Sequence, residues 1–141
     1  MQRKGSAVWQ GDLKEGKGTV STESGILKQA PYSFQTRFEQ EKGTNPEELL
    51  AAAHAGCFTM ALSAELGKAG ITPQKLETTA TVTLDKVGEG FTITKSHLDL
   101  TATISGADKA KFDAAVKAAE TGCPVSKLYK AEITVTSKLV N

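Results

Sequence analysis

Cys57 and Cys123 are the two cysteines of this 141-residue chain, and they stand 66 residues apart. In an oxidising compartment such a pair could form one structural disulfide. In a reducing compartment the two thiols are either inert and buried or a redox couple. Their number and separation favour inert thiols, so the residues around each cysteine must decide.

Cys57 lies in the middle of a predicted helix over residues 46–68, among alanines and other apolar residues. Burial in apolar surroundings raises the pKa of a thiol and makes it unreactive, unless a fixed cation stabilises the thiolate. The helix carries no Lys or Arg near Cys57. His54, one turn earlier, could pair with the thiol, or it could be held by other groups in a subunit interface.

Cys123 has a different setting, because Pro124 follows it. Proline is favoured at the first position of a helix, so Cys123 is the predicted N-cap of a short helix over residues 125–130. Backbone N–H groups at that position favour a thiolate. An ordinary turn in which the cysteine is merely small remains the alternative. The two cysteines are therefore chemically unequal, as an attacking and a resolving thiol would be.

The elements around these residues indicate an α+β chain with mainly antiparallel strands. Asn45 as N-cap, Pro46 at the first position and Glu48 three residues after the cap mark the start of the 46–68 helix. A β-rich unit with inserted helices follows over residues 74–141. The predicted strands span residues 6–9, 18–21, 32–38, 78–84, 91–104 and 133–139, and a further helix spans 108–119. The apolar face of strand 91–104 changes parity near residues 95–97, which indicates a bulge.

The helix over residues 46–68 is apolar almost all round, so it must be enclosed on every side. Its small residues would let a second helix approach closely. We therefore expect an intertwined homodimer that buries this helix at its centre. The alternative is a helix wrapped by the sheet of its own chain.

The length, net charge and apolar stretches of the chain argue against several classes of function. One domain over residues 1–141 accounts for the length. A net charge of +1 provides no basic surface for phosphates, which argues against a nucleic-acid partner. The longest stretch without charged residues, 49–64, is shorter than the roughly 20 apolar residues of a membrane span. No apolar run follows the basic N-terminus, which argues against a secretory signal. We therefore expect a cytoplasmic protein that is not inserted in a membrane.

Two segments are recognisable together: residues 45–58 read NPEELLAAAHAGCF, and residues 122–126 read GCPVS. They resemble the OsmC/Ohr family of thiol peroxidases. Trp9, residues 18–20 and residues 34–38 resemble its OsmC branch, so the resemblance covers essentially the whole chain. It implies a homodimer in which two curved sheets enclose a pair of central helices.

The resemblance also implies roles for four residues. Cys57 is the peroxidatic cysteine, Cys123 the resolving one, Arg37 the activating arginine and Glu47 its carboxylate partner. An arginine on the polar face of a strand is by itself most simply a solvated side chain, but Cys57 needs a cation from another element. Glu48 is expected to cap the helix, which leaves Glu47 to orient the arginine.

The implied reaction reduces organic hydroperoxides to alcohols through a Cys57 sulfenic acid and a Cys57–Cys123 disulfide. A dithiol of the lipoyl type or a small thiol then reduces the disulfide. No metal, haem or flavin cofactor is needed. Phe38, Phe58 and Met60 are candidates for an apolar lining that favours organic peroxides.

Three other functions are compatible with parts of the sequence. A hydrolase could pair Cys57 with His54, but it gives Cys123 no task. A non-enzymatic binding dimer would use both cysteines only for packing. A zinc site lacks a pair of ligands at the usual close spacing. Its potential ligands are Cys57, Cys123, His54 and His97.

Overall fold

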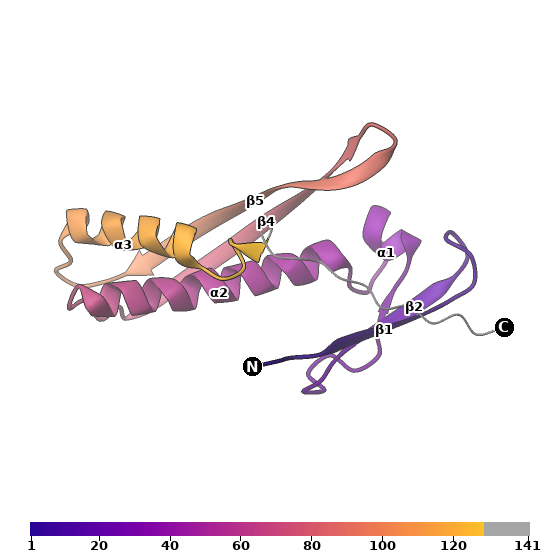
Figure 1. Cartoon of the computed structure of the whole chain (residues 1–141), viewed down its shortest axis with the longest axis horizontal. Coiled ribbons are helices and arrows are strands. Elements are labelled where there is room, and N and C mark those ends of the chain that lie inside the picture. The colour runs from indigo at the N-terminus through magenta and orange to yellow at the C-terminus, as the bar shows by residue number, and fades with distance from the viewer. Residues whose placement is uncertain (129–141) are drawn as a thin grey trace. The chain divides into compact units, whose positions relative to one another are not determined.

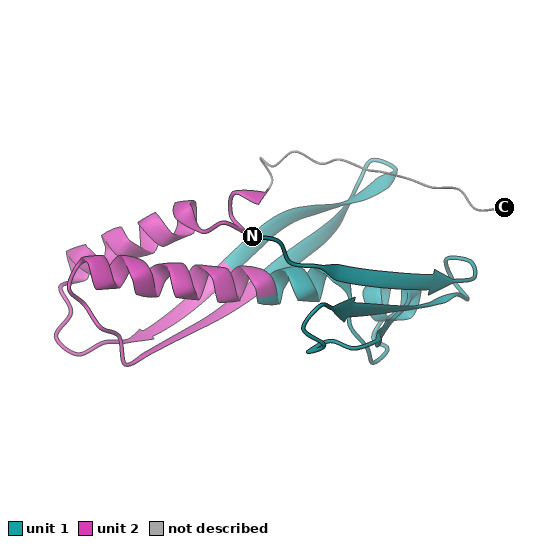
Figure 2. Ribbon diagram, turned by 60° about the horizontal axis from the view of Figure 1, so that its bottom comes forward, with its two compact units in different colours: residues 1–52, 81–97 teal, residues 53–80, 98–141 magenta. Residues whose placement is uncertain are grey.

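The computed structural model describes residues 1–128 (Figure 1). It divides into two compact units, shown in Figure 2. Unit 1 contains residues 1–52 and 81–97, and unit 2 contains residues 53–80 and the chain from residue 98 onward. The predicted strand over residues 133–139 lies outside the described residues, as does the end of the predicted helix over residues 125–130.

Unit 1 begins with an antiparallel three-stranded sheet of order β1–β2–β3. Strands β1 (Gly5–Gln10) and β2 (Lys17–Thr22) confirm the first two predicted strands, with Ala7 opposite Val20. Strand β3 (Ala30–Tyr32) completes the sheet. The rings of Trp9 and Tyr32 stack at 5.4 Å across Gly18, where an added Cβ would lie about 2.5 Å from ring atoms. Glycine is needed there because the two rings occupy the space of a side chain.

The predicted strand over residues 32–38 is wrong beyond Tyr32. Residues Phe34–Phe38 form a short helix, α1. Ser33 is its N-cap: its hydroxyl accepts from the N–H of Thr36 at 3.2 Å, and its own N–H donates to the Thr36 hydroxyl at 2.7 Å. This reciprocal cap outweighs the polar–apolar alternation that favoured a strand. Arg37 consequently extends from a helix, not from the polar face of a strand.

The central helix α2 (Pro46–Lys68) has the predicted boundaries. The Asn45 side chain oxygen accepts from the N–H of Glu48 at 2.8 Å, as a helix N-cap does. The predicted capping box is incomplete, because the Glu48 carboxylate accepts from the hydroxyl of Thr44 at 2.9 Å. At the other end, Gly70 adopts a positive φ of 76°, and the N–H of Ile71 donates to the carbonyl of Leu66. This is the Schellman pattern of helix termination.

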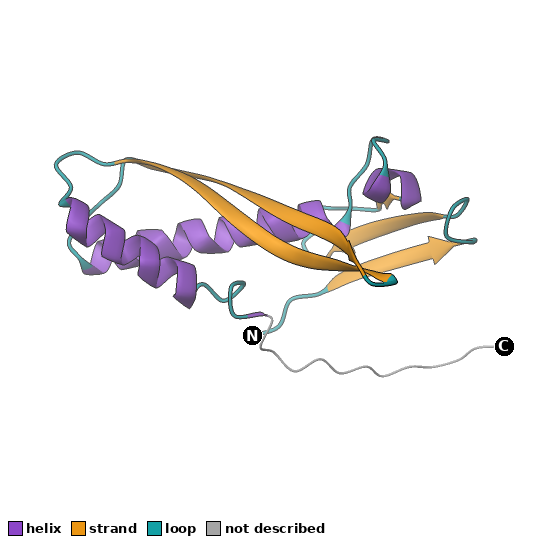
Figure 3. Cartoon of the chain, turned by 90° about the horizontal axis from the view of Figure 1, so that it is seen from above, coloured by secondary structure: helices purple, strands orange, loops and turns teal. Residues whose placement is uncertain are grey.

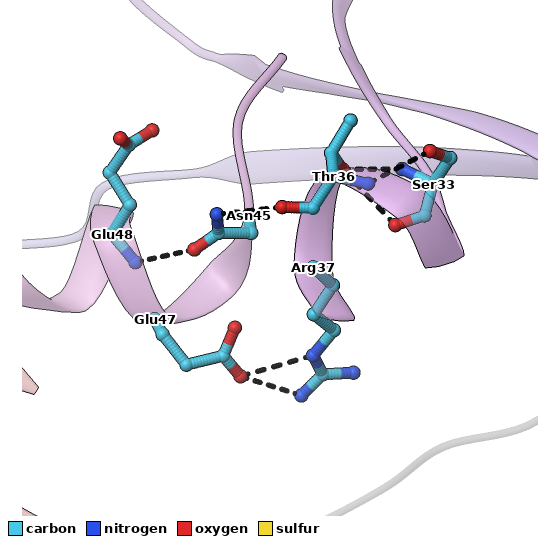
Figure 4. Close-up of polar contacts among 6 residues, drawn as sticks. All are labelled: Ser33, Thr36, Arg37, Asn45, Glu47 and Glu48. Atoms are coloured by element: carbon cyan, nitrogen blue, oxygen red, sulfur yellow. Dashed lines mark hydrogen bonds and ion pairs between the residues drawn. The ribbon is translucent and has the colours of Figure 1, made fainter. Parts of the chain in front are cut away.

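Asn45 also joins α1 to α2 (Figure 4). Its amide nitrogen donates to the carbonyl of Thr36 at 3.1 Å, while its oxygen caps α2. Thr36 and Thr44, on either side of this contact, are the buried polar residues of the described chain. The two helices are therefore fixed to each other within unit 1, a few residues from both Arg37 and Glu47.

In unit 2, α2 and α3 (Lys109–Gly122) lie side by side (Figures 1 and 3). The Asp108 carboxylate caps α3 by accepting from the N–H of Ala110 at 2.8 Å. Cys123 directly follows this helix as its C-cap. The buried side chains of both helices form one apolar core, made of Phe58, Leu62, Leu66, Ala115, Ala119 and Cys123.

Strands β4 (Lys75–Val87) and β5 (Gly90–Thr103) form an antiparallel hairpin, which turns at Gly88 with a φ of 63°. Burial alternates along β4 as predicted as far as Val82, but Thr83 is half-buried like its neighbours. Along β5 the half-buried positions change from odd to even numbers between Ile93 and Ser96, with two successive exposed residues between them. The predicted shift of face is therefore present at the expected place.

Among the residues that the structure describes, helix α2 is only partly buried. It has the length and apolarity of a membrane span, but only 17% of its most apolar window is buried. A core helix of a soluble protein passes the same test, so this is weak evidence for a membrane. Within residues 1–128, the sheets of the chain leave much of this helix uncovered.

Two substitutions of Asn45 distinguish the contribution of its helix cap from that of its hydrogen bond to Thr36. Asn45→Ala removes both, and we expect a loss of about 1–2 kcal/mol in the free energy of unfolding. Asn45→Asp keeps the capping oxygen and loses only the donor to Thr36, so its loss should be smaller. Urea unfolding of the three proteins measures the order. An Asp variant as unstable as the Ala variant would show that the link to Thr36, not the cap, dominates.

Candidate active site

Arg37 and Glu47 form an ion pair within unit 1 (Figure 4). Nε and Nη2 of Arg37 both donate to the same oxygen, Oε1 of Glu47, at 3.0 and 2.8 Å. The Glu47 side chain is 12% exposed, whereas that of Arg37 is 38% exposed. The carboxylate thus holds the arginine by one edge and leaves part of the guanidinium facing outward. The structure brings these two predicted residues together.

The second carboxylate oxygen of Glu47, Oε2, is buried and has no hydrogen-bond partner among the residues that the structure describes. A buried carboxylate oxygen without a donor is costly. This atom is therefore a place where a donor from outside the described chain would be stabilising.

A cluster of aromatic rings lies beside the arginine in unit 1 and contacts it through Phe38. The guanidinium carbon of Arg37 lies 5.4 Å from the centre of the Phe38 ring, within cation–π range. Phe38 also packs against Phe34 and Phe91, with both pairs of ring centres 5.0 Å apart. Phe91 is 57% exposed, so this cluster presents an apolar surface beside a cation.

Cys57 and Cys123 meet within unit 2. Cys57 is half-buried on α2, Cys123 is buried at the end of α3, and both are free thiols. The two thiols interact directly, since each cysteine changes the pKa of the other. The fold therefore places two cysteines that are distant in sequence in direct contact, as disulfide formation requires.

The two thiols have opposite pKa shifts. Burial raises the pKa of Cys57, and its hydrogen bond to Cys123 raises it further. Burial alone would also raise the pKa of Cys123. That effect is outweighed by the hydrogen bonds it accepts from Cys57, from the backbone and hydroxyl of Ser126 and from the backbone of Val125, so its pKa is lowered. In this chain the thiolate character lies with Cys123.

These contacts agree with the prediction that backbone N–H groups after Pro124 favour a thiolate at Cys123. The local structure differs from the prediction, because residues 124–127 form turns and not a regular helix. The N–H of Lys127 donates to the carbonyl of Cys123 at 3.2 Å. Turn geometry is enough to direct N–H groups toward the sulfur.

His54 contacts a residue that the sequence analysis did not select. Its Nε2 lies 3.0 Å from the hydroxyl oxygen of Ser126. The position of Ser126, three residues after Cys123, is the signal that could have identified it, because the third residue after an N-cap faces the capping side chain.

The comparisons with known proteins place the chain in a family. The family described as "OsmC-like protein" matches residues 39–138. The chain belongs to the OsmC family. It is 58% identical over 139 residues to "Peroxiredoxin OsmC" of Escherichia coli (strain K12), covering 99% of this chain and 97% of that protein. It is also 36% identical over 98 residues to "Organic hydroperoxide resistance protein OhrA" of Bacillus subtilis (strain 168), covering 68% of this chain and 67% of that protein.

Solved structures of OsmC-family proteins have the same fold. The organic hydroperoxide resistance protein OhrB of Bacillus subtilis is similar with a TM-score of 0.64 and 26% identity, over 90% of each chain. A Legionella pneumophila protein described as an organic hydroperoxide resistance protein OsmC has a TM-score of 0.63 and 28% identity, over 90% of this chain and 89% of that one. These similarities confirm the predicted α+β class with antiparallel sheets and a long helix.

The zinc alternative gains no support from the OsmC-family fold. Within residues 1–128, no group of three or more His, Cys, Asp or Glu side chains is arranged to hold a metal ion. Cys57 and Cys123 instead contact each other and the segment after Pro124.

The lowered pKa of Cys123 predicts its titration. In a Cys57→Ser variant, which keeps a hydroxyl donor at position 57, the thiolate of Cys123 should appear at a lower pH than that of a cysteine in an unfolded peptide. The sign follows from the donors, which stabilise the charged form. Ultraviolet absorbance of the thiolate against pH measures it, with the unfolded variant as control. Titration at or above the pH of the unfolded control would contradict the prediction.

Proposed function

We propose that the chain reduces organic hydroperoxides to alcohols through a Cys57 sulfenic acid and a Cys57–Cys123 disulfide, which a dithiol then reduces. The observation that carries this proposal is the contact between the two cysteines in unit 2. The Arg37–Glu47 pair of unit 1 supports it, because a cation is what a buried thiolate requires.

The peroxidase class follows from the relatives. The protein named Peroxiredoxin OsmC matches nearly the whole chain at 58% identity, and the proteins named for organic hydroperoxide resistance match two thirds of it or more. The chain is a thiol-dependent peroxidase. The names of the resistance proteins support organic hydroperoxides as its substrates.

The proposed reaction has three steps. The Cys57 thiolate attacks the terminal oxygen of the hydroperoxide, the O–O bond breaks, and the alkoxide takes a proton to leave as the alcohol. The Cys123 thiolate then attacks the sulfur of the Cys57 sulfenic acid, and the hydroxide that leaves takes a proton to form water. A dithiol reduces the disulfide by attack on Cys57, so that Cys123 leaves as a thiolate and the dithiol becomes a disulfide.

The first step needs a cation near Cys57, because burial and the bond to Cys123 favour its protonated form. Arg37 is the proposed cation. Its planar guanidinium stays charged when desolvated, and it can contact a thiolate and a carboxylate at once. The edge that Glu47 leaves outward can also stabilise the alkoxide as the O–O bond breaks.

Helix geometry supports the proposal that this arginine comes from a second subunit. Glu47 and Cys57 are ten residues apart on α2, so their backbones are separated by about 15 Å along the helix axis. Two copies of α2 packed antiparallel would place the start of one beside the middle of the other. We therefore propose a homodimer in which Arg37 and Glu47 of one chain serve Cys57 of its partner.

The exposed side of α2 supports this dimer. Its exposed positions recur at the three- and four-residue spacing of one helix face and carry mostly small residues. They include Ala53, Gly56, Met60, Ala64 and Gly67. Met60 is 78% exposed, and the glycines allow close approach of a second helix. Cys57 stands four residues after Ala53 and three before Met60, so it borders this face.

The rings of Phe34, Phe38 and Phe91 support a preference for organic substrates, because they offer an apolar surface next to Arg37. Phe58, a predicted lining residue, belongs to the apolar core against which Cys57 packs. A lipoyl-type or small thiol reductant fits free cysteines in the reducing cytoplasm. Neither metal nor organic cofactor is needed in these steps.

The hydrolase alternative has less support than the peroxidase. The Nε2 atom of His54 lies against Ser126, and a hydrolase gives no task to the contact between Cys57 and Cys123. Ester turnover without peroxide is the assay that would favour it.

Substitution of each cysteine tests the proposed order of events. Cys57→Ser should abolish peroxide consumption. Cys123→Ser should permit one stoichiometric turnover and leave a sulfenic acid at Cys57, because no second thiol is present to condense with it. Peroxide consumed per subunit and mass spectrometry with a sulfenic-acid trapping reagent measure both results.

The reverse outcome has a physical basis, since Cys123 is the cysteine with the lowered pKa. If Cys123→Ser is inactive on the first turnover while Cys57→Ser is not, the roles of the two cysteines are exchanged.

Mixed dimers test whether the site is shared. Cys57→Ser and Arg37→Ala proteins are each expected to be inactive, but unfolding and refolding them together should restore about a quarter of the wild-type activity. Half of the randomly assorted dimers are mixed, and each mixed dimer has one intact site of two. Refolding each variant alone is the control. Mixed dimers that form, as mass measurement can establish, but stay inactive would show that Arg37 serves its own subunit.

A further inference from the structure

A polar contact runs alongside the contact between the two cysteines. His54 precedes Cys57 by three residues on α2, and Ser126 follows Cys123 by three residues. His54 Nε2 and Ser126 Oγ lie 3.0 Å apart, and both residues are half-buried in unit 2. The same two chain segments are therefore joined twice, once through sulfur and once through a histidine and a hydroxyl.

The Ser126 hydroxyl has one proton, and its direction can be assigned. The backbone and the hydroxyl of Ser126 both lower the pKa of Cys123, which is the effect of donors directed at its sulfur. A hydroxyl that donates to sulfur can only accept from its other partner. On this basis we assign the hydrogen to Nε2 of His54, so that Nε2 donates to Ser126 Oγ across 3.0 Å.

We propose that His54 and Ser126 are positioning residues for Cys123: His54 orients the Ser126 hydroxyl, and that hydroxyl holds the Cys123 sulfur ready to act as a thiolate. This inference rests on the proposed peroxidase cycle, in which Cys123 resolves the sulfenic acid. It gives His54 a task at the second cysteine, although His54 lies nearer in sequence to the first.

The contacts that stabilise the Cys123 thiolate affect two steps of the proposed cycle, resolution and reduction. In resolution, the Cys123 thiolate attacks the sulfur of the Cys57 sulfenic acid, the S–S bond forms and the S–O bond breaks. In reduction, an external thiolate attacks Cys57 and Cys123 leaves with the electron pair of the S–S bond. Hydrogen bonds that stabilise the Cys123 thiolate increase the fraction available for attack and improve it as a leaving group. Oxidation of Cys57 by peroxide does not use them.

The experiment separates the two chemical steps in one turnover. The full-length protein in its reduced form receives one equivalent of cumene hydroperoxide. Mass spectrometry of quenched samples then follows the trapped sulfenic acid and the disulfide over time. The variants are Ser126→Ala, His54→Leu and His54→Gln, because the amide nitrogen of Gln can donate from nearly the position of Nε2. Thr121→Ala is the matched control, since it removes an exposed hydroxyl two residues before Cys123 that donates to the Lys117 carbonyl.

Ser126→Ala and His54→Leu should form the sulfenic acid no more slowly than the wild type, because a less charged Cys123 raises the pKa of Cys57 less. They should convert it to the disulfide about three- to tenfold more slowly. A pKa rise of about one unit lowers the thiolate fraction up to tenfold, and the higher nucleophilicity of a more basic thiolate offsets part of that loss. His54→Gln should recover most of the rate, and Thr121→Ala should match the wild type. In a Cys57→Ser background, Ser126→Ala should raise the pH at which the Cys123 thiolate absorbs by about one unit.

Three results would overturn the proposal: disulfide formation at the wild-type rate in folded Ser126→Ala, a His54→Gln protein as slow as His54→Leu, or an unshifted thiolate titration. If Ser126→Ala does not fold, as circular dichroism would show, the two His54 variants decide by themselves. Failure of the peroxidase cycle has a different signature, because no sulfenic acid would then form in Cys123→Ser.

Discussion

A negative charge on sulfur is unstable in an apolar interior unless hydrogen-bond donors or a cation surround it. The described chain supplies such stabilisation to Cys123 but not to Cys57. Cys123 is buried, yet it accepts hydrogen bonds from Cys57, Val125 and Ser126. Cys57 packs against the same core, and both its burial and its bond to Cys123 favour the protonated form. A peroxidatic role for Cys57 therefore needs a charge that its own surroundings do not supply.

Helix α2 is the element on which the groups of the proposed site depend. It carries Glu47 in its first turn, and His54 and Cys57 near its middle. Asn45 fixes the start of this helix to α1, so the Arg37–Glu47 ion pair joins two short segments that are already held together. The turn after Cys123 meets the middle of α2 through both Cys57 and His54. Much of the chemistry thus rests on one helix and on the segments that cap or contact it.

The apolar residues of α2 provide two packing surfaces. Phe58, Leu62 and Leu66 fill the core of unit 2, and the small residues on the exposed face offer a second packing surface. In the first turn of the same helix, the buried Oε2 of Glu47 has no hydrogen-bond partner within the described chain.

Short-range sequence patterns were sufficient to predict the elements whose ends depend only on neighbouring residues. The Asn45 cap and the Gly67–Gly70 stop were sufficient to predict α2 with its observed bounds, because helix termini depend on neighbouring residues. The pairing of Arg37 with Glu47 and the unequal character of the two cysteines were also predicted.

The strand predicted for the segment after Tyr32 was wrong. Period-2 alternation over seven residues cannot be distinguished from a short helix until the Ser33–Thr36 cap is seen. The family resemblance implied that Cys57 meets Cys123, but only the tertiary structure decided which neighbours shift the pKa values of the two thiols and that His54 lies against Ser126. Those facts depend on segments about 70 residues apart, and which side chains meet across such a distance is set by packing, not by local pattern.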